Sequence, residues 1–386
     1  MVLADPGEFI SAKVMSEGSF GNTQLLKSLI EAGRVHFHDD NSHNDRERKP
    51  VTDTDTETVT RGALQPTIMI DVGANLGSLA LYARALGESV LAVEPQPGMR
   101  ARLQAACHLN GWCPAAAASA ASAASAASAA SAASASAAAA AADDDDDDDD
   151  ETEIETEIDA ETERESRTPF MQIFPFAISD ESGRDVDLVT NWQTTGGLRN
   201  SGVATMTAID FAGDNNVDTE NMEVISVPTT TLDDLLASLS SVTSTSSAST
   251  AALLTPLSRI SVLKLDCEGC EPLALLGAHT LFHTNPPYAI LTEVNSGRLL
   301  SSGWTVLSFF QLIESYGYDL CDTDMRRYGV SPSRDAELFT HALAKKEMHS
   351  ESGSAGGGAA GGGDSVYDVV AVLKEKNKEE TPLRGI

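Results

Sequence analysis

The chain has 386 residues and a formal net charge of −32. One run over residues 143–165 holds sixteen acidic residues and one arginine, which contributes −15 and leaves −17 for the rest. The rest shows no basic stripe, so nucleic acid is not expected as a partner, because phosphate backbones are bound by clustered Lys and Arg. No window approaches the roughly 20 apolar residues that span a bilayer, and the first residues lack the features of a signal peptide. We therefore expect a soluble, cytoplasmic protein.

The cysteines are an odd number in a chain with no secretory signal, so no disulfide framework is expected and a reducing compartment is the default. Cys267 and Cys270 have the spacing of redox pairs, but thioredoxin-like use needs that motif after a different first strand. Two cysteines alone do not form a zinc site. We expect both to be semi-buried packing residues.

The first predicted element is a short amphipathic helix over Gln24–Gly33, which ends at a glycine. A polar connector follows, so residues 1–62 form an N-terminal helix and linker. The main domain is expected over 63–376, with a C-terminal tail over 377–386. Three low-complexity inserts interrupt the domain, because their compositions cannot build a packed core. They are an Ala/Ser and Asp tract over 114–168, a Ser/Thr-rich stretch over 238–256 and a Gly-rich stretch over 349–363.

The ordered segments alternate between strand-like and helix-like patterns, which predicts an α/β fold with a largely parallel sheet of about seven strands. The strand candidates are Thr67–Val72, Ser89–Glu94, Met171–Ile178, Ile260–Asp266, Tyr288–Val294, Tyr318–Cys321 and Val366–Lys374, with shorter strands at Asp185–Val189, Val203–Ile209 and Glu223–Val227. The helix candidates are Leu76–Leu86, Met99–Asn110, Thr231–Leu239, Pro272–Phe282 and Val306–Tyr316.

The segment I-M-I-D-V-G-A-N-L-G has the order strand, glycine-rich turn, helix. Gly73 allows a sharp turn and leaves no side chain where a ligand approaches, while Gly77 permits close packing of the helix start. Asp71 lies at the carboxyl end of the strand, where open α/β sheets bind ligands. The G-x-x-x-G spacing differs from dinucleotide and P-loop motifs. An acid in the turn repels a pyrophosphate but can pair with the amino group of a methionine moiety.

A second strand, V-L-A-V-E-P, ends in Glu94, which can accept hydrogen bonds from both ribose hydroxyls of an adenosine ligand. The alternative is a surface glutamate at a strand end. NAD enzymes place an acid at the same point, so Glu94 alone supports adenosine and does not select one cofactor.

The later segment I-S-V-L-K-L-D-C-E-G-C-E ends a buried strand with three acids. Asp266 and Glu268 lie at the strand end, Glu271 opens a helix, and Lys264 can neutralise a neighbour. The strand Y-A-I-L-T-E-V brings Glu293 to the same edge, where a carboxylate could act as a general base. The alternative is helix capping and ion pairing on a surface turn. Histidines form no Ser-His-Asp or H-E-x-x-H pattern.

These segments together resemble the FkbM family of S-adenosylmethionine-dependent methyltransferases. The matching stretches also include F-A-I-S-D-E-S-G and T-T-L-D-D-L. The resemblance implies a Rossmann-like class I methyltransferase fold, with helices on both faces of a seven-stranded, mostly parallel sheet of order 3-2-1-4-5-7-6 and an antiparallel last strand. It also implies S-adenosylmethionine as cofactor and methyl transfer to a hydroxyl on a sugar, a glycoconjugate or another small metabolite.

Carried over by position, the resemblance gives each candidate residue a role. Asp180 would lie at the adenine edge, although the long insert before the adenine-proximal strand departs from the family pattern. Glu94 would bind the ribose. The methionine part would be lined by Asp71, Gly73, Asn75 and Gly77, and the acceptor would be faced by Asp266, Glu268 and Glu293.

Other classes of function stay open. One is a non-catalytic adenosine-binding or interaction module whose inserts recruit partners. Another is a metal-assisted O-methyltransferase that uses Asp266 and Glu293 as oxygen ligands for Mg²⁺. An NAD oxidoreductase fits least, because of the glycine spacing.

Overall fold

The computed structural model describes residues 23–45, 67–113, 169–190, 204–205, 223–241, 259–341, 343 and 366–374. The insert predicted at 114–168 and the one predicted at 349–363 lie outside these residues. The insert predicted at 238–256 begins inside helix α7 (Leu232–Ser241). None of the helices in the described residues is long and apolar enough to cross a membrane.

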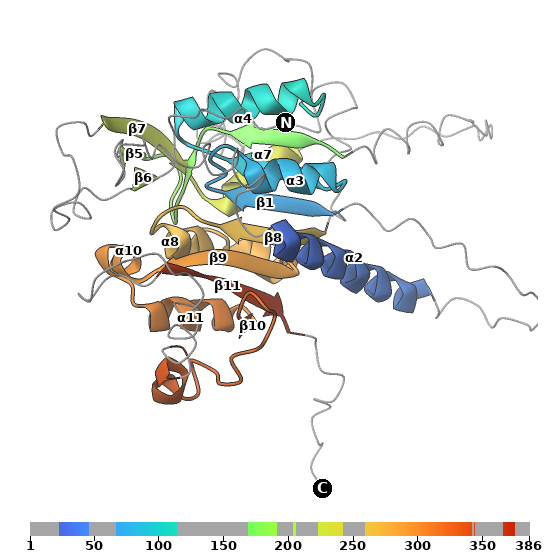
Figure 1. The fold of residues 1–386 in the computed structure, drawn as a ribbon, viewed down its shortest axis with the longest axis vertical. Helices are drawn as coiled ribbons and strands as arrows, with labels where there is room; N and C mark the ends of the chain where they lie inside the picture. Colours follow the sequence, from blue (N-terminus) through green and yellow to red (C-terminus); the bar gives the residue numbers. More distant parts are fainter. Residues whose placement is uncertain are drawn as a thin grey trace, which may run out of the picture.

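A seven-stranded sheet forms the centre of the domain, with the order β10-β11-β9-β8-β1-β2-β3 (Figure 1). Its strands are β1 (Ile68–Val72), β2 (Ser89–Val93), β3 (Met171–Phe174), β8 (Ile260–Leu265), β9 (Ala289–Asn295), β10 (Tyr318–Cys321) and β11 (Val366–Leu373). The neighbouring strands β3, β2, β1, β8 and β9 are parallel, and β11 runs antiparallel to both β9 and β10. The predicted fold class and strand order are confirmed.

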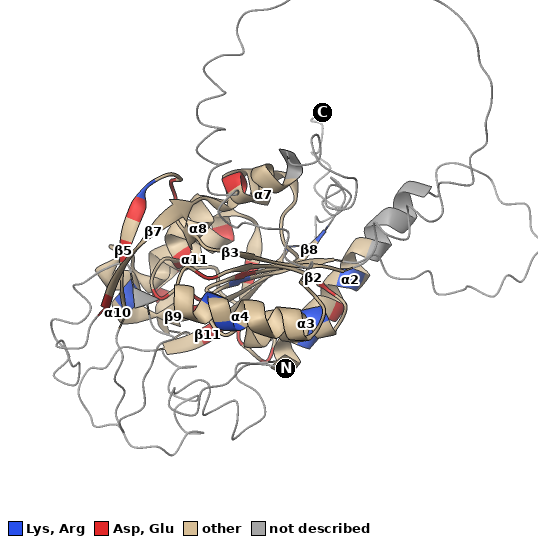
Figure 2. Cartoon of the chain, turned by 90° about the horizontal axis from the view of Figure 1, so that it is seen from above, with Lys and Arg blue, Asp and Glu red and all other residues tan. Residues whose placement is uncertain are grey.

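Helices cover both faces of this sheet (Figure 2). One face packs against α2 (Thr23–Asp45), α3 (Ser78–Ala85) and α4 (Pro97–Leu109), and the other packs against α7, α8 (Glu271–Leu276), α9 (His279–Thr284) and α11 (Val306–Ser315). Side chains point alternately to the two faces of the sheet along each strand, so each face has its own hydrophobic core. In β1, Ile68, Ile70 and Val72 face the α7 side and Met69 faces the α2 side. Because side chains alternate, Asp71 shares the face of Met69.

A second, smaller sheet has the order β4-β7-β5-β6. Its strands are β4 (Ala177–Ile178), β5 (Asp185–Thr190), β6 (Ala204–Thr205) and β7 (Glu223–Thr230). The single strand predicted at Met171–Ile178 is therefore wrong, since the chain leaves the central sheet after Phe174 and joins the small sheet at Ala177. Pro175 lies at this break and has no N–H to donate to a strand ladder.

Helix α2 continues to Asp45, so the prediction that it ends at Gly33 and gives way to a connector is wrong. Gly33 serves close packing instead. A Cβ atom there would lie 3.2 Å from Cα of Ser261 and 3.3 Å from Cδ1 of Tyr288. Arg34 also forms an ion pair with the fully buried Glu88, which accepts hydrogen bonds from the hydroxyls of Thr67 and Ser261. The helix is thereby fixed to the amino-terminal edge of the sheet.

Two further helix predictions need correction. The helix predicted at Pro272–Phe282 is split into α8 and α9 around Gly277, where a Cβ atom would collide with the carbonyl oxygen of Ser179. The short helix α10 (Ser296–Ser301) was not predicted. Its N-cap is Asn295, whose side chain accepts a hydrogen bond from the backbone N–H of Arg298 at 3.1 Å.

The cysteines also differ from the prediction. The structure pairs Cys107 with Cys113 and Cys267 with Cys270 in disulfides, each with 5.4 Å between Cα atoms. Cys321 is free and buried. The expectation that no disulfide forms is wrong, because the folded backbone brings the members of each pair, six and three residues apart in the chain, to a Cα separation that suits a disulfide.

Candidate active site

The site lies at the carboxyl ends of the parallel strands β2, β1, β8 and β9, because parallel strands end at the same edge of a sheet. The loop after β1 carries the glycine-rich turn, and β2 is followed by Glu94. The loop after β8 carries Asp266 and Glu268, and β9 includes Glu293 near its end. The structure thus brings most of the predicted site residues to one edge.

The turn after β1 has a left-handed backbone at Gly73 (φ 77°), Asn75 (φ 53°) and Gly77 (φ 80°). A Cβ atom at Gly77 would collide with Leu103 of α4, which confirms its predicted role in packing the helix start. At Gly73 the space for a Cβ atom is filled by the carbonyl oxygen of Asp266. Gly73 therefore lets the loops after β1 and β8 touch, whereas the sequence predicted that it leaves room for a ligand.

Asp71 is 1% exposed and forms an ion pair with Lys264, at 2.9 Å between Oδ1 and Nζ. Burial raises the pKa of Asp71, and the charge of Lys264 opposes this shift. Burial alone would lower the pKa of Lys264, but Asp71 and Asp266 together outweigh it and raise the pKa above its usual value. The contact of Asp71 in the protein is thus Lys264, and its predicted contact with the methionine moiety stays a prediction.

Glu94 is 2% exposed, and both of its carboxylate oxygens accept backbone hydrogen bonds. The N–H of Asn75 donates to Oε2 at 2.7 Å, and the N–H of Gln96 donates to Oε1 at 2.8 Å. Burial raises the pKa of Glu94 to about 7, although these two bonds and the charges of Lys264 and Arg100 oppose the shift. Each oxygen keeps a second lone pair that a hydroxyl can use.

Asp180 belongs to a different sheet. It follows β4 in the small sheet, and its contacts are a hydrogen bond from the Ser179 hydroxyl at 3.0 Å and an ion pair with Arg184 at 3.7 Å. Both partners lie within four residues of it. The structure gives Asp180 a local role in this turn, and its predicted place at the adenine edge stays a prediction.

The three acids predicted to face the acceptor form a cluster. Each of Asp266, Glu268 and Glu293 offers a carboxylate oxygen, and these three oxygens lie within 4.8 Å of one another. Burial raises the pKa of Glu268 to about 7 against the effect of Arg298. Burial also raises the pKa of Glu293 to about 8, and the charges of Asp266 and Glu268 add to the shift. We refer to these three residues as the acid cluster.

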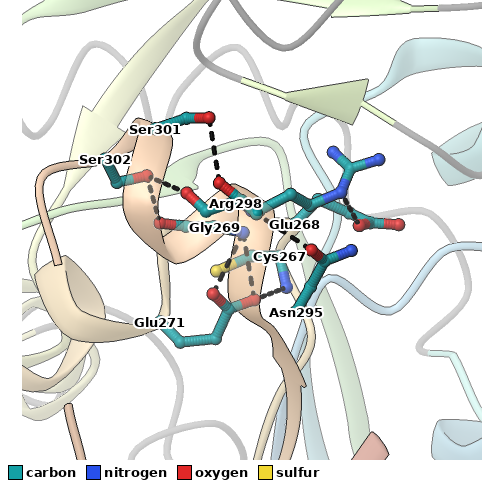
Figure 3. A network of polar contacts seen from close by, with 9 residues as sticks. Cys267, Glu268, Gly269, Glu271, Asn295, Arg298, Ser301 and Ser302 are labelled. Carbon is teal, nitrogen blue, oxygen red and sulfur yellow. Dashed lines mark hydrogen bonds and ion pairs between the residues drawn. The ribbon is translucent and has the colours of Figure 1, made fainter. Parts of the chain in front are cut away.

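The turn that carries Glu268 is held from both sides (Figure 3). Glu268 has a left-handed backbone (φ 62°) and pairs with Nε of Arg298 at 2.9 Å. The buried Glu271 accepts hydrogen bonds from the backbone N–H groups of Cys267 at 2.9 Å and Gly269 at 3.0 Å. The Cys267–Cys270 disulfide closes the same four residues. Glu268 is therefore fixed in place and does not belong to a free surface turn.

Arg298 and Ser302 are site residues that the sequence prediction missed. The Ser302 hydroxyl donates to the carbonyl oxygen of Gly269 at 2.9 Å, and Arg298 is the counter-ion of Glu268. Both depend on helix α10, which follows β9. The signal for this helix is Asn295 at the strand end, since Asn is a favoured N-cap.

Comparison with known protein families agrees with this geometry. Residues 71–320 match the family model described as the methyltransferase FkbM domain. The chain belongs to the FkbM methyltransferase family. The FkbM match begins at Asp71 in β1 and ends at Leu320 in β10, so it includes the glycine turn, Glu94 and the acid cluster. Searches of the curated proteins and of the solved structures found no match to the chain.

Proposed function

We propose that the protein is an S-adenosylmethionine-dependent methyltransferase that methylates a hydroxyl on a sugar, a glycoconjugate or another small metabolite. The observation that carries this proposal is the contact between the two halves of the site. The glycine turn after β1 packs directly on the carbonyl oxygen of Asp266, so a cofactor at the turn would lie beside the acid cluster. Family membership supports methyl transfer.

The residues of the cofactor half fit an adenosine ligand. Glu94 is held by two backbone N–H groups and keeps a lone pair on each oxygen for the ribose hydroxyls. Its position after β2, beside the turn after β1, is the one that acids use for ribose in Rossmann-like folds. When bound, S-adenosylmethionine would supply the activated methyl group. The protein would bind it through Glu94 and the turn from Gly73 to Gly77.

In the acceptor half, Glu293 is the best candidate for the general base. Asp266 forms an ion pair with Lys264, which Asp71 shares, and Glu268 forms an ion pair with Arg298. No ion pair of Glu293 is found within the residues that the structure describes. Burial and the neighbouring acids raise the pKa of Glu293 to about 8, so it holds a proton more tightly than a free glutamate. A base with a pKa near the working pH is well suited to take the acceptor hydroxyl proton.

The experiment is a methyl-transfer assay with isotopically labelled S-adenosylmethionine and pools of sugars, glycoconjugates and small hydroxylated metabolites. We expect label in an acceptor fraction, and we expect Glu293→Gln to lower transfer while cofactor affinity measured by calorimetry stays unchanged. Cofactor binding without transfer to any pool would favour a non-catalytic binding module. A chain that binds no S-adenosylmethionine would overturn the proposal.

A second candidate, metal-assisted transfer, is favoured by the spacing of the acid cluster. Three carboxylate oxygens within 4.8 Å of one another could share one cation, and carboxylates are preferred ligands of Mg²⁺. A chelator separates the two mechanisms. Loss of transfer in the chelator and its return with Mg²⁺ would support metal assistance, and unchanged transfer would support the carboxylate base.

A further inference from the structure

Lys264 connects the two halves of the site. It lies on β8, its side chain is 9% exposed, and its Nζ atom has three oxygen neighbours. Nζ donates a hydrogen bond to the carbonyl oxygen of Gly73 at 2.8 Å, pairs with Oδ1 of Asp71 at 2.9 Å and pairs with Oδ2 of Asp266 at 3.5 Å. Two of these partners belong to β1 and its turn, and the third follows β8.

The chemistry of an ammonium group suits this position. It carries three N–H donors, and the three oxygens around Nζ can accept all of them. A buried lysine normally loses its charge, but the two carboxylates keep this one protonated. The contact with Gly73 is not needed to balance charge. It instead holds the backbone of the turn at the point where that turn meets Asp266.

We propose that Lys264 is a positioning residue for the cofactor, holding the turn after β1 in register with the acid cluster through Gly73, Asp71 and Asp266. The inference rests on the proposed function, because it assigns Lys264 a task in S-adenosylmethionine binding. The charge of Lys264 also acts on Glu94 and Glu268, whose pKa values it lowers against the larger effect of burial. Its influence therefore reaches both the cofactor half and the acceptor half.

The competing explanation is that Lys264 is only the buried counter-ion of Asp71. The two explanations differ for Lys264→Arg, which keeps the positive charge but replaces a compact ammonium with a planar fork. A counter-ion survives this exchange. A residue that must donate to Gly73 while it pairs with two carboxylates does not, because the fork directs its N–H groups differently.

The test is isothermal titration of S-adenosylmethionine into the wild-type chain, Lys264→Arg and Lys264→Met. The stoichiometry reports the folded fraction, whereas Kd is a property of the folded molecules alone. We expect Kd to rise about tenfold or more in Lys264→Arg, because small displacements of a binding group have large effects. The matched control is Arg34→Lys, the reverse exchange at the pair that Arg34 forms with the buried Glu88 on the opposite edge of the sheet. Its Kd should equal that of the wild type.

A second readout is the pH dependence of Kd. The groups that act on Glu94 are the N–H groups of Asn75 and Gln96 and the charges of Lys264 and Arg100. Removal of the charge in Lys264→Met should move the midpoint of S-adenosylmethionine binding to higher pH, which a loss of folded protein alone does not do.

The outcomes separate this inference from the proposed function. A wild-type Kd in Lys264→Arg would show that Lys264 is a counter-ion only, even if Lys264→Met fails to fold. An equal rise of Kd in Arg34→Lys would attribute the effect to general loosening of the domain and would also overturn the inference. Absence of binding by the wild-type chain would overturn the proposed function itself.

Discussion

Glu94 allows the sharpest test of the cofactor half. Replacement by Ala removes a carboxylate that accepts two backbone hydrogen bonds, at 2.7 Å from Asn75 and 2.8 Å from Gln96. Hydrogen bonds to charged groups contribute about 1.5–3 kcal/mol each. One lost bond to a ribose hydroxyl therefore weakens S-adenosylmethionine binding about tenfold to a hundredfold, and two lost bonds weaken it further. Calorimetric titration measures the change in Kd.

The control for Glu94→Ala is Glu88→Ala. Glu88 is the buried acid next to the start of β2 and accepts side-chain hydrogen bonds from Thr67, Ser261 and Arg34. Its loss should lower the free energy of unfolding without changing Kd for the cofactor. An unchanged Kd in folded Glu94→Ala would refute the assignment of Glu94 to the ribose. A similar rise of Kd in both variants would show that the effect comes from general loosening of the folded domain.

The raised pKa of Glu94 predicts how S-adenosylmethionine binding and protein stability depend on pH. Burial raises the pKa of Glu94 from 4.5 in the unfolded chain to about 7 in the fold. The folded state therefore holds a proton that the unfolded state has lost, and the contribution of Glu94 to stability is present below pH 4.5 and lost as pH rises through 7. Ligand binding has the opposite trend, because the ionised carboxylate accepts the ribose hydroxyls best. Kd should fall between about pH 6 and pH 8, roughly one unit on either side of that pKa, and a flat profile would contradict this.

Three further predictions concern the rest of the site. Glu293→Gln should abolish the rise of the methyl-transfer rate as pH increases through about 8, and a retained rise would exclude Glu293 as the base. Reduction of the Cys267–Cys270 disulfide should lower the free energy of unfolding by about 2 kcal/mol, as chain entropy predicts for a short loop. Chemical denaturation of Cys267→Ser/Cys270→Ser in reducing and non-reducing buffer measures it, and equal stability of variant and wild type in non-reducing buffer would contradict it. Gly73→Ala should cost at least about 1–3 kcal/mol, because it adds a collision with Asp266 to a left-handed backbone; thermal unfolding at the wild-type temperature would contradict this close contact.

The central sheet could be predicted because its information is local and repeated. Each parallel strand is a short apolar run that a helix pattern follows, and the resemblance supplied the strand order that the structure shows. The predicted short strands at Asp185–Val189 and Glu223–Val227 also exist. Of the strand predicted at Val203–Ile209, the structure has Ala204–Thr205 as β6, and the rest lies outside the described residues. Their assembly into a separate sheet with Ala177–Ile178 was missed, because strand pairing between distant segments leaves no periodic signal in the sequence.

The errors have a common physical origin in contacts between distant residues. The local pattern predicts a helix end at Gly33, but this glycine permits close approach to Ser261 and Tyr288. The local pattern predicts a helix across Gly277, but the carbonyl oxygen of Ser179 occupies the space beside this glycine. In each case the glycine is needed for close contact with a residue on another element. The local pattern does not contain this contact, so it predicts the wrong helix boundary.

The candidate site likewise has a part that depends on local sequence and a part that depends on contacts between distant residues. Two features, Glu94 and the turn after β1, could be predicted from the sequence. They depend on a strand, a glycine turn and a helix that follow one another along the chain, and this order is a local pattern. The acid cluster is different, because Glu293 and Asp266 meet only when β8 and β9 pair, and Glu268 is fixed by Arg298 from a helix that the sequence did not reveal. Lys264 was visible as a neutralising charge, but its contact with Gly73 required the fold. Lys264, which connects the two halves of the site, therefore has a role that no local sequence pattern predicts. Its substitution tests whether cofactor binding depends on that connection.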